Sequence, residues 1–231
     1  MAKGIFITAT GTDVGKTYIC ALLIKKLRNM GLNAGYYKGV LSGAAKSDGL
    51  LVPQDAEYVN RTANIGASLE DMVSYVYENA VSPHLAAKIE ARPVQAEKIL
   101  EDFYRVSGTY EYLTVEGSGG IVCPIRADEK EFMLTDFIKA FNLSILIVSS
   151  AKLGDINNCV LTVEYAKSCG INIKGIILNR FNAGNLLEED NKKMIEYLTK
   201  VPVVACVEDN AQDIELADIT SLYEESSILW N

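Results

Sequence analysis

Three residues that could hold a phosphate group, Gly15-Lys16-Thr17, follow an apolar stretch and a loop of small and polar residues. A strand, a loop and a helix that opens with these residues form the layout of a phosphate-binding loop, in which backbone N–H groups and a helix N-terminus hold a polyphosphate. The lysine would reach the terminal phosphates and the threonine hydroxyl would coordinate Mg²⁺. The usual spacing G-x-x-x-x-G-K-[ST] is not met, because Thr10 stands at the first glycine position and Gly11 follows it. The order of elements still predicts a nucleoside triphosphate site.

Polar side chains also stand where other strands are expected to end. Lys38 and Ser42 follow the second strand, and Glu116 ends a later strand before a run of small residues. Asp55 opens a helical segment. In doubly wound sheets, ligands bind at the carboxyl ends of the strands, so these side chains are candidates for a shared site. Mg²⁺ prefers oxygen ligands and usually takes one or two carboxylates plus phosphate oxygens, a set that Thr17, Asp55 and Glu116 would complete.

Several of these residues also have a structural interpretation, which the sequence leaves open. Lys38 could be a solvated lysine at a strand end, and Asp55 could only cap a helix. Asn179 could be a turn residue, although its amide would also suit an adenine edge. For His84, the chain's single histidine, a structural hydrogen bond is favoured over proton transfer.

Strand and helix patterns alternate along the chain, with lengths typical of repeated β-α units. Strands are expected at residues 4–8, 34–38, 112–115, 143–149, 173–178 and 201–207. Helices are expected at residues 16–30, 54–62, 82–91, 93–106, 155–168 and 186–198, with a helical end at 211–225 and a loop at 39–53. This order predicts an α/β fold with a doubly wound, mainly parallel sheet of the P-loop NTPase type. A single domain over residues 1–231 is expected.

Composition excludes several classes of protein. The net charge of −8 argues against a nucleic-acid binder, which would need a basic face. The five cysteines include no C-x-x-C pair, so buried, reduced thiols are expected rather than disulfides or a metal cluster. No apolar run approaches the roughly 18–20 residues of a membrane span. The first strand begins without a preceding leader pattern, and we expect a soluble cytoplasmic protein with no membrane partner.

Five motifs, in chain order and at the strand ends, resemble those of the dethiobiotin synthetase family over nearly the whole chain. The family's loop T-G-T-D-T-E-V-G-K-T has the length of residues 8–17, with Ala9, Gly11 and Asp13 as differences. The family's K-P-V-x-S-G, S-P-H, E-G-A-G-G and K-L-G-x-I-N are similar to Lys38-Gly39-Val40-Leu41-Ser42-Gly43, Ser82-Pro83-His84, Glu116-Gly117-Ser118-Gly119-Gly120 and Lys152-Leu153-Gly154-Asp155-Ile156-Asn157.

The resemblance implies an ATP- and Mg²⁺-dependent ligase that closes the ureido ring of dethiobiotin from 7,8-diaminopelargonic acid and CO₂, as a homodimer. It assigns catalysis to Lys38 and Lys16, and metal binding to Thr17, Asp55 and Glu116. The implied ATP contacts are Asp13, Val14, Gly15, Lys16, Thr17, Tyr18, Asp55, Glu116, Gly117, Ser118, Gly119, Asn179, Val207 and Glu208. The implied substrate contacts are Thr12, Lys38, Ser42, Gly154 and Asn157, of which the last two would lie near the partner subunit.

Two other classes of function share this fold. Partition-type ATPases of the MinD and ParA kind are nucleotide-switched dimers, but they carry a signature lysine at the position of Gly11. Amidotransferase-type ligases of cobalamin synthesis append a glutaminase domain, for which 231 residues leave no room. A regulatory module without catalysis is a third possibility, against which the presence of Lys38, Ser42, Asp55 and Glu116 argues.

Overall fold

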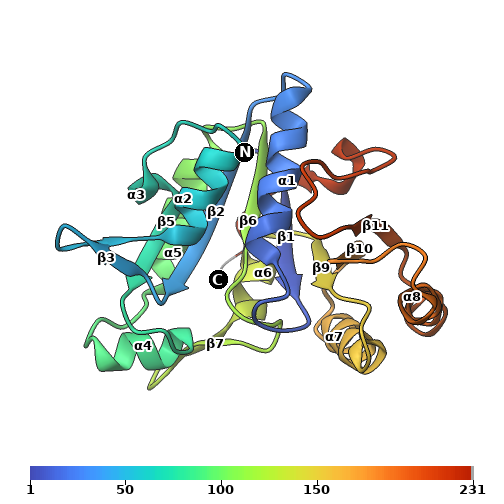
Figure 1. Cartoon of the computed structure of the whole chain (residues 1–231). Coiled ribbons are helices and arrows are strands. Elements are labelled where there is room, and N and C mark those ends of the chain that lie inside the picture. The colour runs from blue at the N-terminus through green and yellow to red at the C-terminus, as the bar shows by residue number, and fades with distance from the viewer. Residues whose placement is uncertain (230–231) are drawn as a thin grey trace.

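The structure, a computed structural model, describes residues 1–229 and is built around a mainly parallel sheet (Figure 1). Seven strands lie in the order β11-β10-β9-β1-β6-β2-β5, and each neighbouring pair is parallel. They are β1 (Lys3–Ala9), β2 (Ala34–Ser42), β5 (Val73–Tyr77), β6 (Tyr112–Glu116), β9 (Ile145–Ser149), β10 (Ile173–Asn179) and β11 (Val203–Val207). A short strand, β12 (Glu224–Glu225), adds to β1 in the antiparallel sense. The α/β class expected from the sequence is confirmed.

Helices cover both faces of the sheet and enclose two apolar cores. One face carries α1 (Lys16–Asn29), α2 (Gln54–Thr62), α3 (Leu69–Met72) and the short 3-10 helix η1 (Thr220–Leu222). The other carries α4 (Pro83–Ile89), α5 (Ala96–Ser107), α6 (Leu134–Ala140), α7 (Asp155–Ser168) and α8 (Leu186–Thr199). Within β1, Ile5 and Ile7 enter the core under α1, whereas Phe6 enters the opposite core. A strand buried on both faces therefore reads as a continuous apolar run.

The segment 39–53, expected to be a loop, is largely strand. β2 continues to Ser42, because Val40 and Leu41 are buried at 2% and 4% exposure and pair with β5. A hairpin of β3 (Ala45–Ser47) and β4 (Leu50–Val52) follows. Its turn residues Asp48 and Gly49 both have positive φ, at 52° and 81°. A tight two-residue hairpin turn usually requires positive φ at both of its residues. Asp48-Gly49 is therefore a hairpin signal in the sequence, which the prediction of a loop did not use.

The segment 211–225, expected to be helical, contains only the turn of η1 and the strand β12. Its buried residues Ile214, Ile219 and Leu222 pack individually against the core that contains α1, without a helical repeat. The Asp218 side chain accepts hydrogen bonds from the backbone N–H groups of Thr220 and Ser221 at the start of η1. β5, α3, α6 and a second hairpin, β7 (Pro124–Ala127) with β8 (Glu131–Met133), were not expected.

All five cysteines are free; Cys20, Cys123 and Cys159 are buried as expected, whereas Cys169 and Cys206 are only half-buried. Within residues 1–229, no helix is both long enough and apolar enough to cross a membrane. The parallel register places the carboxyl ends of β1, β6 and β2 together, with Ile7 opposite Glu116 and Glu116 opposite Lys38. This edge of the sheet carries the site.

Candidate functional site

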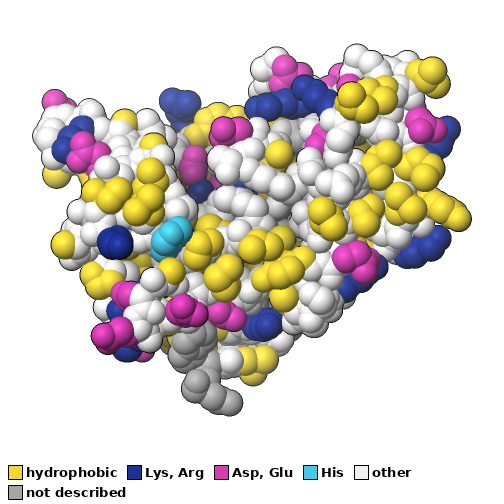
Figure 2. Space-filling view, turned by 90° about the horizontal axis from the view of Figure 1, so that it is seen from below, with side chains coloured by type: hydrophobic (Ala, Val, Ile, Leu, Met, Phe, Trp, Pro, Cys, Tyr) yellow, Lys and Arg dark blue, Asp and Glu magenta, His cyan; other side chains and the backbone are white. Residues whose placement is uncertain are grey.

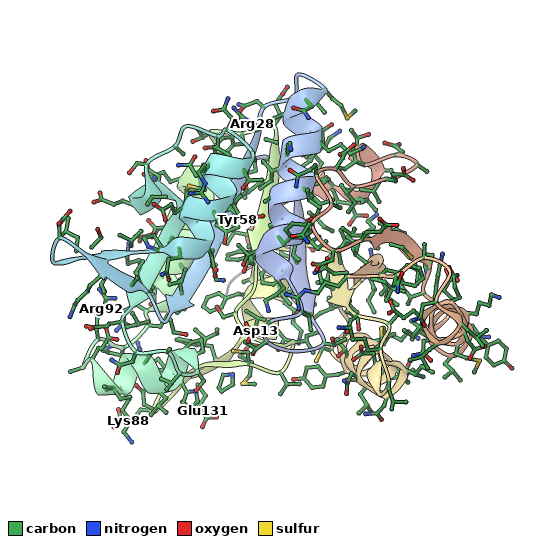
Figure 3. All side chains as sticks on the ribbon, viewed as in Figure 1. Asp13, Arg28, Tyr58, Lys88, Arg92 and Glu131 are labelled. Carbon is green, nitrogen blue, oxygen red and sulfur yellow. The ribbon has the colours of Figure 1, made fainter. Side chains whose placement is uncertain are left out.

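A cavity of about 610 Å³ opens at the carboxyl ends of β1, β2, β6 and β10. Figure 2 shows this end of the molecule, which is hollowed and carries both basic and acidic side chains. In Figure 3, Tyr58 lies between α2 and α1, and Asp13 lies near the carboxyl end of the sheet. The predicted residues that line the cavity are Thr12, Asp13, Gly15, Lys16, Thr17, Tyr18, Lys38, Ser42, Asp55, Glu116, Ser118 and Gly119. A volume of this size is typical of small-molecule sites.

The phosphate-binding loop, residues 8–17, wraps between β1 and α1. Asp13 and Gly15 adopt left-handed backbone conformations, with φ of 60° and 97°. A Cβ atom at Gly15 would lie 2.1 Å from Nδ2 of Asn179, so this position requires glycine. The N-cap residue of α1 is Gly15, which has no side chain to accept from the first N–H groups of the helix. Those donors remain available to an anion.

Lys16 extends from the first turn of α1 into the cavity wall. Its side chain is buried, and its Nζ donates to the backbone oxygen of Gly11 at 3.2 Å. Burial lowers the pKa of Lys16, and the positive charge of Lys38 adds to this effect, although Glu116 partly opposes it. An ammonium group has three N–H donors, and a buried ammonium group therefore has a strong affinity for a negatively charged group.

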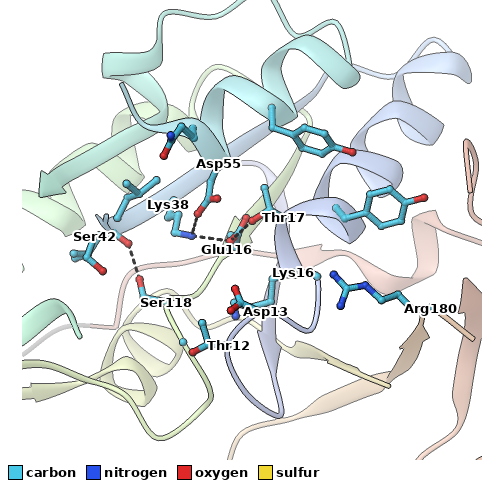
Figure 4. A pocket seen from close by; sticks show the side chains of 17 residues that line it. Thr12, Asp13, Lys16, Thr17, Lys38, Ser42, Asp55, Glu116, Ser118 and Arg180 are labelled. Atoms are coloured by element: carbon cyan, nitrogen blue, oxygen red, sulfur yellow. Dashed lines mark hydrogen bonds and ion pairs between the residues drawn. The ribbon is translucent and has the colours of Figure 1, made fainter. Parts of the chain in front are cut away.

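Lys38 joins Asp55 and Glu116, two of the acidic residues that line the cavity (Figure 4). Its Nζ lies 2.5 Å from Oδ2 of Asp55 and 2.7 Å from Oε1 of Glu116. Burial alone would lower the pKa of Lys38, but the negative charges of Glu116 and Asp55 outweigh burial and raise the pKa. The ammonium group therefore stays charged at neutral pH. Lys38 is thus a buried cation paired with two carboxylates, and the interpretation as a solvated lysine is wrong.

Glu116 receives hydrogen bonds on both carboxylate oxygens. Thr17 Oγ1 donates to Oε1 at 2.9 Å, and the Tyr36 hydroxyl donates to Oε2 at 2.9 Å. Burial, together with the negative charge of Glu116, raises the pKa of Tyr36 well above its ordinary value. The phenol consequently remains a proton donor. No role in the site was expected for Tyr36 from the sequence, because its contact with Glu116 depends on the register of β2 against β6.

The expected metal ligands are close enough to act together. Thr17 Oγ1 contacts Glu116, and Lys38 connects Glu116 to Asp55. Among the described residues, no three His, Cys, Asp or Glu side chains form a ready-made metal site. Two carboxylates and one hydroxyl fit a Mg²⁺ ion that takes its other ligands from phosphate oxygens and water. Asp55 lies in the first turn of α2, which has no side-chain cap, so the interpretation as a helix cap is wrong.

The loop after β6 is tied to β2. Ser118 Oγ donates to the backbone oxygen of Val40 at 2.6 Å, and the Gly117 N–H donates to the Ile7 oxygen at 2.9 Å. A Cβ at Gly117 would lie 2.9 Å from Phe6 and 3.0 Å from Leu134. Gly117 therefore allows close packing below the cavity, which explains one glycine of the run.

Asn179 holds the back of the phosphate-binding loop. Its Nδ2 donates to the Val14 oxygen at 2.9 Å, whereas its buried Oδ1 has no partner within residues 1–229. An unpartnered buried acceptor beside the loop fits a donor on a nucleotide base. Asn179 itself lies outside the cavity wall, whereas Arg180 and Tyr58 line the cavity and were not expected from the sequence. The only available signal for Arg180 was its position after Asn179 at a strand end.

Other expected site residues lie outside the cavity wall. Gly154 and Asn157 lie at the start of α7, and Val207 and Glu208 lie at the end of β11. Val207 pairs with Asn179 and accepts from the Phe181 N–H, which connects it to the site indirectly. The hydrogen bond expected for His84 is absent at its buried Nδ1, which has no partner among the described residues.

The sheet, the loop at its edge and the Lys–carboxylate cluster define a nucleotide-binding protein of the P-loop class. Solved structures agree on the fold. A ParA family ATPase from Chlorobium tepidum has a TM-score of 0.57 at 14% identity, covering 90% of this chain and 86% of its own. The septum site-determining protein MinD from Pyrococcus horikoshii, complexed with Mg-ADP, has a TM-score of 0.55 at 18% identity, covering 91% and 82%. At these identities the similarity concerns the fold alone.

A family profile described as an AAA domain matches residues 3–215. ATP-dependent dethiobiotin synthetase BioD of Clostridium perfringens strain 13 is 49% identical over 224 residues, or 97% of this chain and 98% of that protein. The protein of the same name from Clostridium botulinum strain Langeland is 46% identical over 226 residues, or 97% of this chain and 100% of that protein. The chain belongs to the ATP-dependent dethiobiotin synthetase family, and the resemblance found in the motifs is confirmed.

Proposed function

We propose that this protein, acting as a single domain, converts 7,8-diaminopelargonic acid, CO₂ and ATP into dethiobiotin, ADP and phosphate. The observation that carries the proposal is the position of Lys38. It shares one cavity with the phosphate-binding loop, lies between Asp55 and Glu116, and has Ser42 further along the same strand. A cation in this position could contact both a terminal phosphate and a carbamate, which supports phosphoryl transfer to a carboxylated amine.

The proposed reaction has three steps. One amine of the diamine attacks CO₂ and loses a proton, which gives a carbamate. A carbamate oxygen then attacks the γ-phosphorus, the bond to ADP breaks, and a carbamic–phosphoric anhydride forms. The second amine attacks the anhydride carbon, the bond to phosphate breaks, and the ring closes with loss of a proton. Because the last step is intramolecular, holding both amines in place supplies much of the rate.

Each group in the cavity has a proposed role. Lys16 and the backbone N–H groups of residues 13–17 would hold the β- and γ-phosphates. Lys38 would bridge the carbamate and the γ-phosphate, while Thr12 and Ser42 would orient the diamine. Thr17, Asp55 and Glu116 would hold Mg²⁺, which neutralises charge on the phosphates. The free Oδ1 of Asn179 supports contact with an amino group of the base.

The substrate's carboxylate tail is proposed to lie near Gly154 and Asn157 in a homodimer. Two leucines beside these residues support a second copy as the occupant, since Leu153 is 88% exposed and Leu161 is 62% exposed. Leu153→Asp should shift the protein to monomers in sedimentation. Tyr104→Asp is the control, on α5 and also 62% exposed, and should leave the association unchanged. Monomeric wild-type protein would contradict the homodimer.

The decisive experiment measures phosphate release with ATP, Mg²⁺ and bicarbonate, with and without the diamine. We expect release only with the diamine, in equal amount to the dethiobiotin found by mass spectrometry. A switch ATPase of the MinD or ParA kind would release phosphate without the diamine. Release that ignores the diamine would overturn the proposed function.

A further inference from the structure

Two adjacent tyrosines on β2 point to opposite faces of the sheet. Tyr36 lies in the core under α1, at 1% exposure, and Tyr37 lies in the opposite core, at 0%. The Tyr36 hydroxyl donates to Glu116, whereas the Tyr37 hydroxyl contacts Ser74 and donates to the oxygen of Ile99. The two residues are therefore alike in type, strand and burial, but only Tyr36 contacts a residue of the cavity.

We propose that Tyr36 is a positioning residue, which holds Oε2 of Glu116 so that Oε1 faces the cavity and can bind a divalent cation together with the nucleotide. This inference rests on the proposed function, in which Glu116 is a metal ligand. It assigns a role to a residue outside the set of cavity-lining side chains.

The division of donors between the two oxygens supports this role. Oε1 accepts from Thr17 and Lys38, which both lie in the cavity wall. Among the described residues, Tyr36 is the only donor to Oε2. A cation at Oε1 would have to share that oxygen with Lys38 or displace it, so the contacts on Oε1 change when a cation binds. The bond from Tyr36 remains on the opposite side of the carboxylate.

The position of Tyr36 in the sheet makes that bond rigid. Tyr36 pairs with Thr114 and Lys38 pairs with Glu116, two residues further along the same pair of strands. Residues two apart lie on the same face, so the phenol reaches up beneath the glutamate from the strand alongside. The Tyr36 ring is fully packed and has only two side-chain torsions to fix. A ligand carboxylate held in this way binds its metal more tightly than one free to rotate.

The experiment measures Mn²⁺ binding by electron paramagnetic resonance with ADP at saturation, for wild-type protein, Tyr36→Phe, Tyr37→Phe and Glu116→Gln. Tyr36→Phe should weaken Mn²⁺ binding by about tenfold, as expected for loss of a hydrogen bond to a metal ligand. Tyr37→Phe removes a buried hydroxyl one residue away and should bind Mn²⁺ like the wild type. In the Glu116→Gln background, Tyr36→Phe should change the Mn²⁺ affinity by less than about twofold, because its effect passes through Glu116.

The outcomes separate the two proposals. If Glu116→Gln binds Mn²⁺ like the wild type, the metal site itself is wrong, and the role of Tyr36 fails with it. If Glu116→Gln weakens binding but Tyr36→Phe does not, only the role of Tyr36 is overturned. Equal losses in Tyr36→Phe and Tyr37→Phe would indicate a general packing effect and would also overturn it. If Tyr36→Phe does not fold, 3,5-difluorotyrosine can replace Tyr36. It keeps the hydroxyl but makes it a stronger hydrogen-bond donor to Glu116, so the Mn²⁺ affinity should change. An unchanged Mn²⁺ affinity would contradict the positioning role of Tyr36.

Discussion

The ammonium group of Lys38 lies 2.7 Å from Oε1 of Glu116, and the two side chains are 6% and 1% exposed. The same oxygen accepts from Thr17, whose hydroxyl is the usual Mg²⁺ ligand of a phosphate-binding loop. A divalent cation at this oxygen and Lys38 therefore compete for one carboxylate. Binding of a cation would free Lys38 to turn toward a phosphate or a carbamate in the cavity.

Lys38→Met should separate metal binding from turnover. Turnover should fall by about 10²–10³-fold, the usual loss when a group that stabilises transition-state charge is removed. Mn²⁺ binding in the presence of ADP should stay equal or become tighter, because a competing positive charge has been removed. Dethiobiotin formation and Mn²⁺ titration measure the two effects.

The control for this variant is Lys46→Met. Lys46 lies on the exposed β3 strand, is 55% exposed and pairs with Glu78. Its replacement should change neither turnover nor metal binding. Wild-type turnover in Lys38→Met would eliminate the proposed role of Lys38.

Lys16→Met should stabilise the protein in the absence of nucleotide. The pKa of Lys16 is lower in the folded state than in the unfolded chain. At a pH between these two pKa values, the unfolded chain binds more protons than the folded protein. The free energy of unfolding therefore rises with pH in this range. Below both values the full cost of the buried charge is present. Removing this cost should raise the Tm, and each ~1 kcal/mol corresponds to about 2–4 °C in a chain of this size.

The Tm difference between Lys16→Met and the wild type should be largest at neutral pH. It should shrink as the pH approaches the unfolded lysine pKa of about 10.4, where the wild-type side chain loses its charge in both states. Stabilisation by ADP should be lost in the variant. Lys25→Met, which changes an α1 lysine that donates to the Gln212 oxygen, is the control and should keep the ADP effect. A lower Tm for Lys16→Met at neutral pH would contradict this argument.

The sequence could predict the residues at the strand ends because parallel strands bring their carboxyl ends to one edge. Lys38 and Glu116 are 78 residues apart, yet the pairing of β2 with β6 places them side by side. The role of Tyr36 could not be predicted in this way. Its contact with Glu116 requires one particular register of β2 against β6, and an apolar strand pattern allows several registers. A tyrosine in a strand usually only packs against its neighbours.

The parts of the fold that escaped prediction are short segments. β5 (Val73–Tyr77) is a short edge strand in which buried and half-buried residues alternate, directly after the single turn of α3. The C-terminal segment carries apolar residues and acidic caps, which resemble a helix until the long-range contact of Tyr223 with Thr114 is known. Long-range contacts of this kind decide the structure of short segments, and no local pattern contains them.

Ser118→Ala should loosen the connection between the loop that follows Glu116 and the strand β2 that carries Lys38. The Ser118 hydroxyl donates to Val40 at 2.6 Å, and in the family motifs an alanine stands here while a proline stands at Gly39. We infer that the hydroxyl compensates for the flexible Gly39. Loss of a bond of ~1 kcal/mol predicts about a fivefold lower turnover, with unchanged ADP affinity.

Ser107→Ala is the matched control for Ser118→Ala. Ser107 also donates to a backbone oxygen, that of Tyr104, but it is fully buried, ends α5 and does not line the cavity. Adding Gly39→Pro to Ser118→Ala should restore part of the turnover, since a Cβ atom at Gly39 would meet nothing closer than Ile99 at 3.4 Å. A Ser118→Ala enzyme with wild-type turnover would exclude the compensation.

Arg180→Ala should weaken nucleotide binding in a salt-dependent manner. The guanidinium group points toward the phosphate-binding loop in Figure 4, and among the described residues it forms no ion pair. In a chain of net charge −8, an anionic nucleotide depends on local cations such as Lys16 and Arg180. Loss of one charged hydrogen bond of ~1.5 kcal/mol predicts about a tenfold weaker affinity for ADP at low salt. The difference from the wild type should shrink as salt rises, because the cavity is open to solvent.

The control is Arg61→Ala, which changes an exposed arginine at the end of α2 outside the cavity. This variant should leave ADP affinity unchanged in calorimetry at each salt concentration. An Arg180→Ala loss that equals that of Arg61→Ala would show that Arg180 acts only through the net charge.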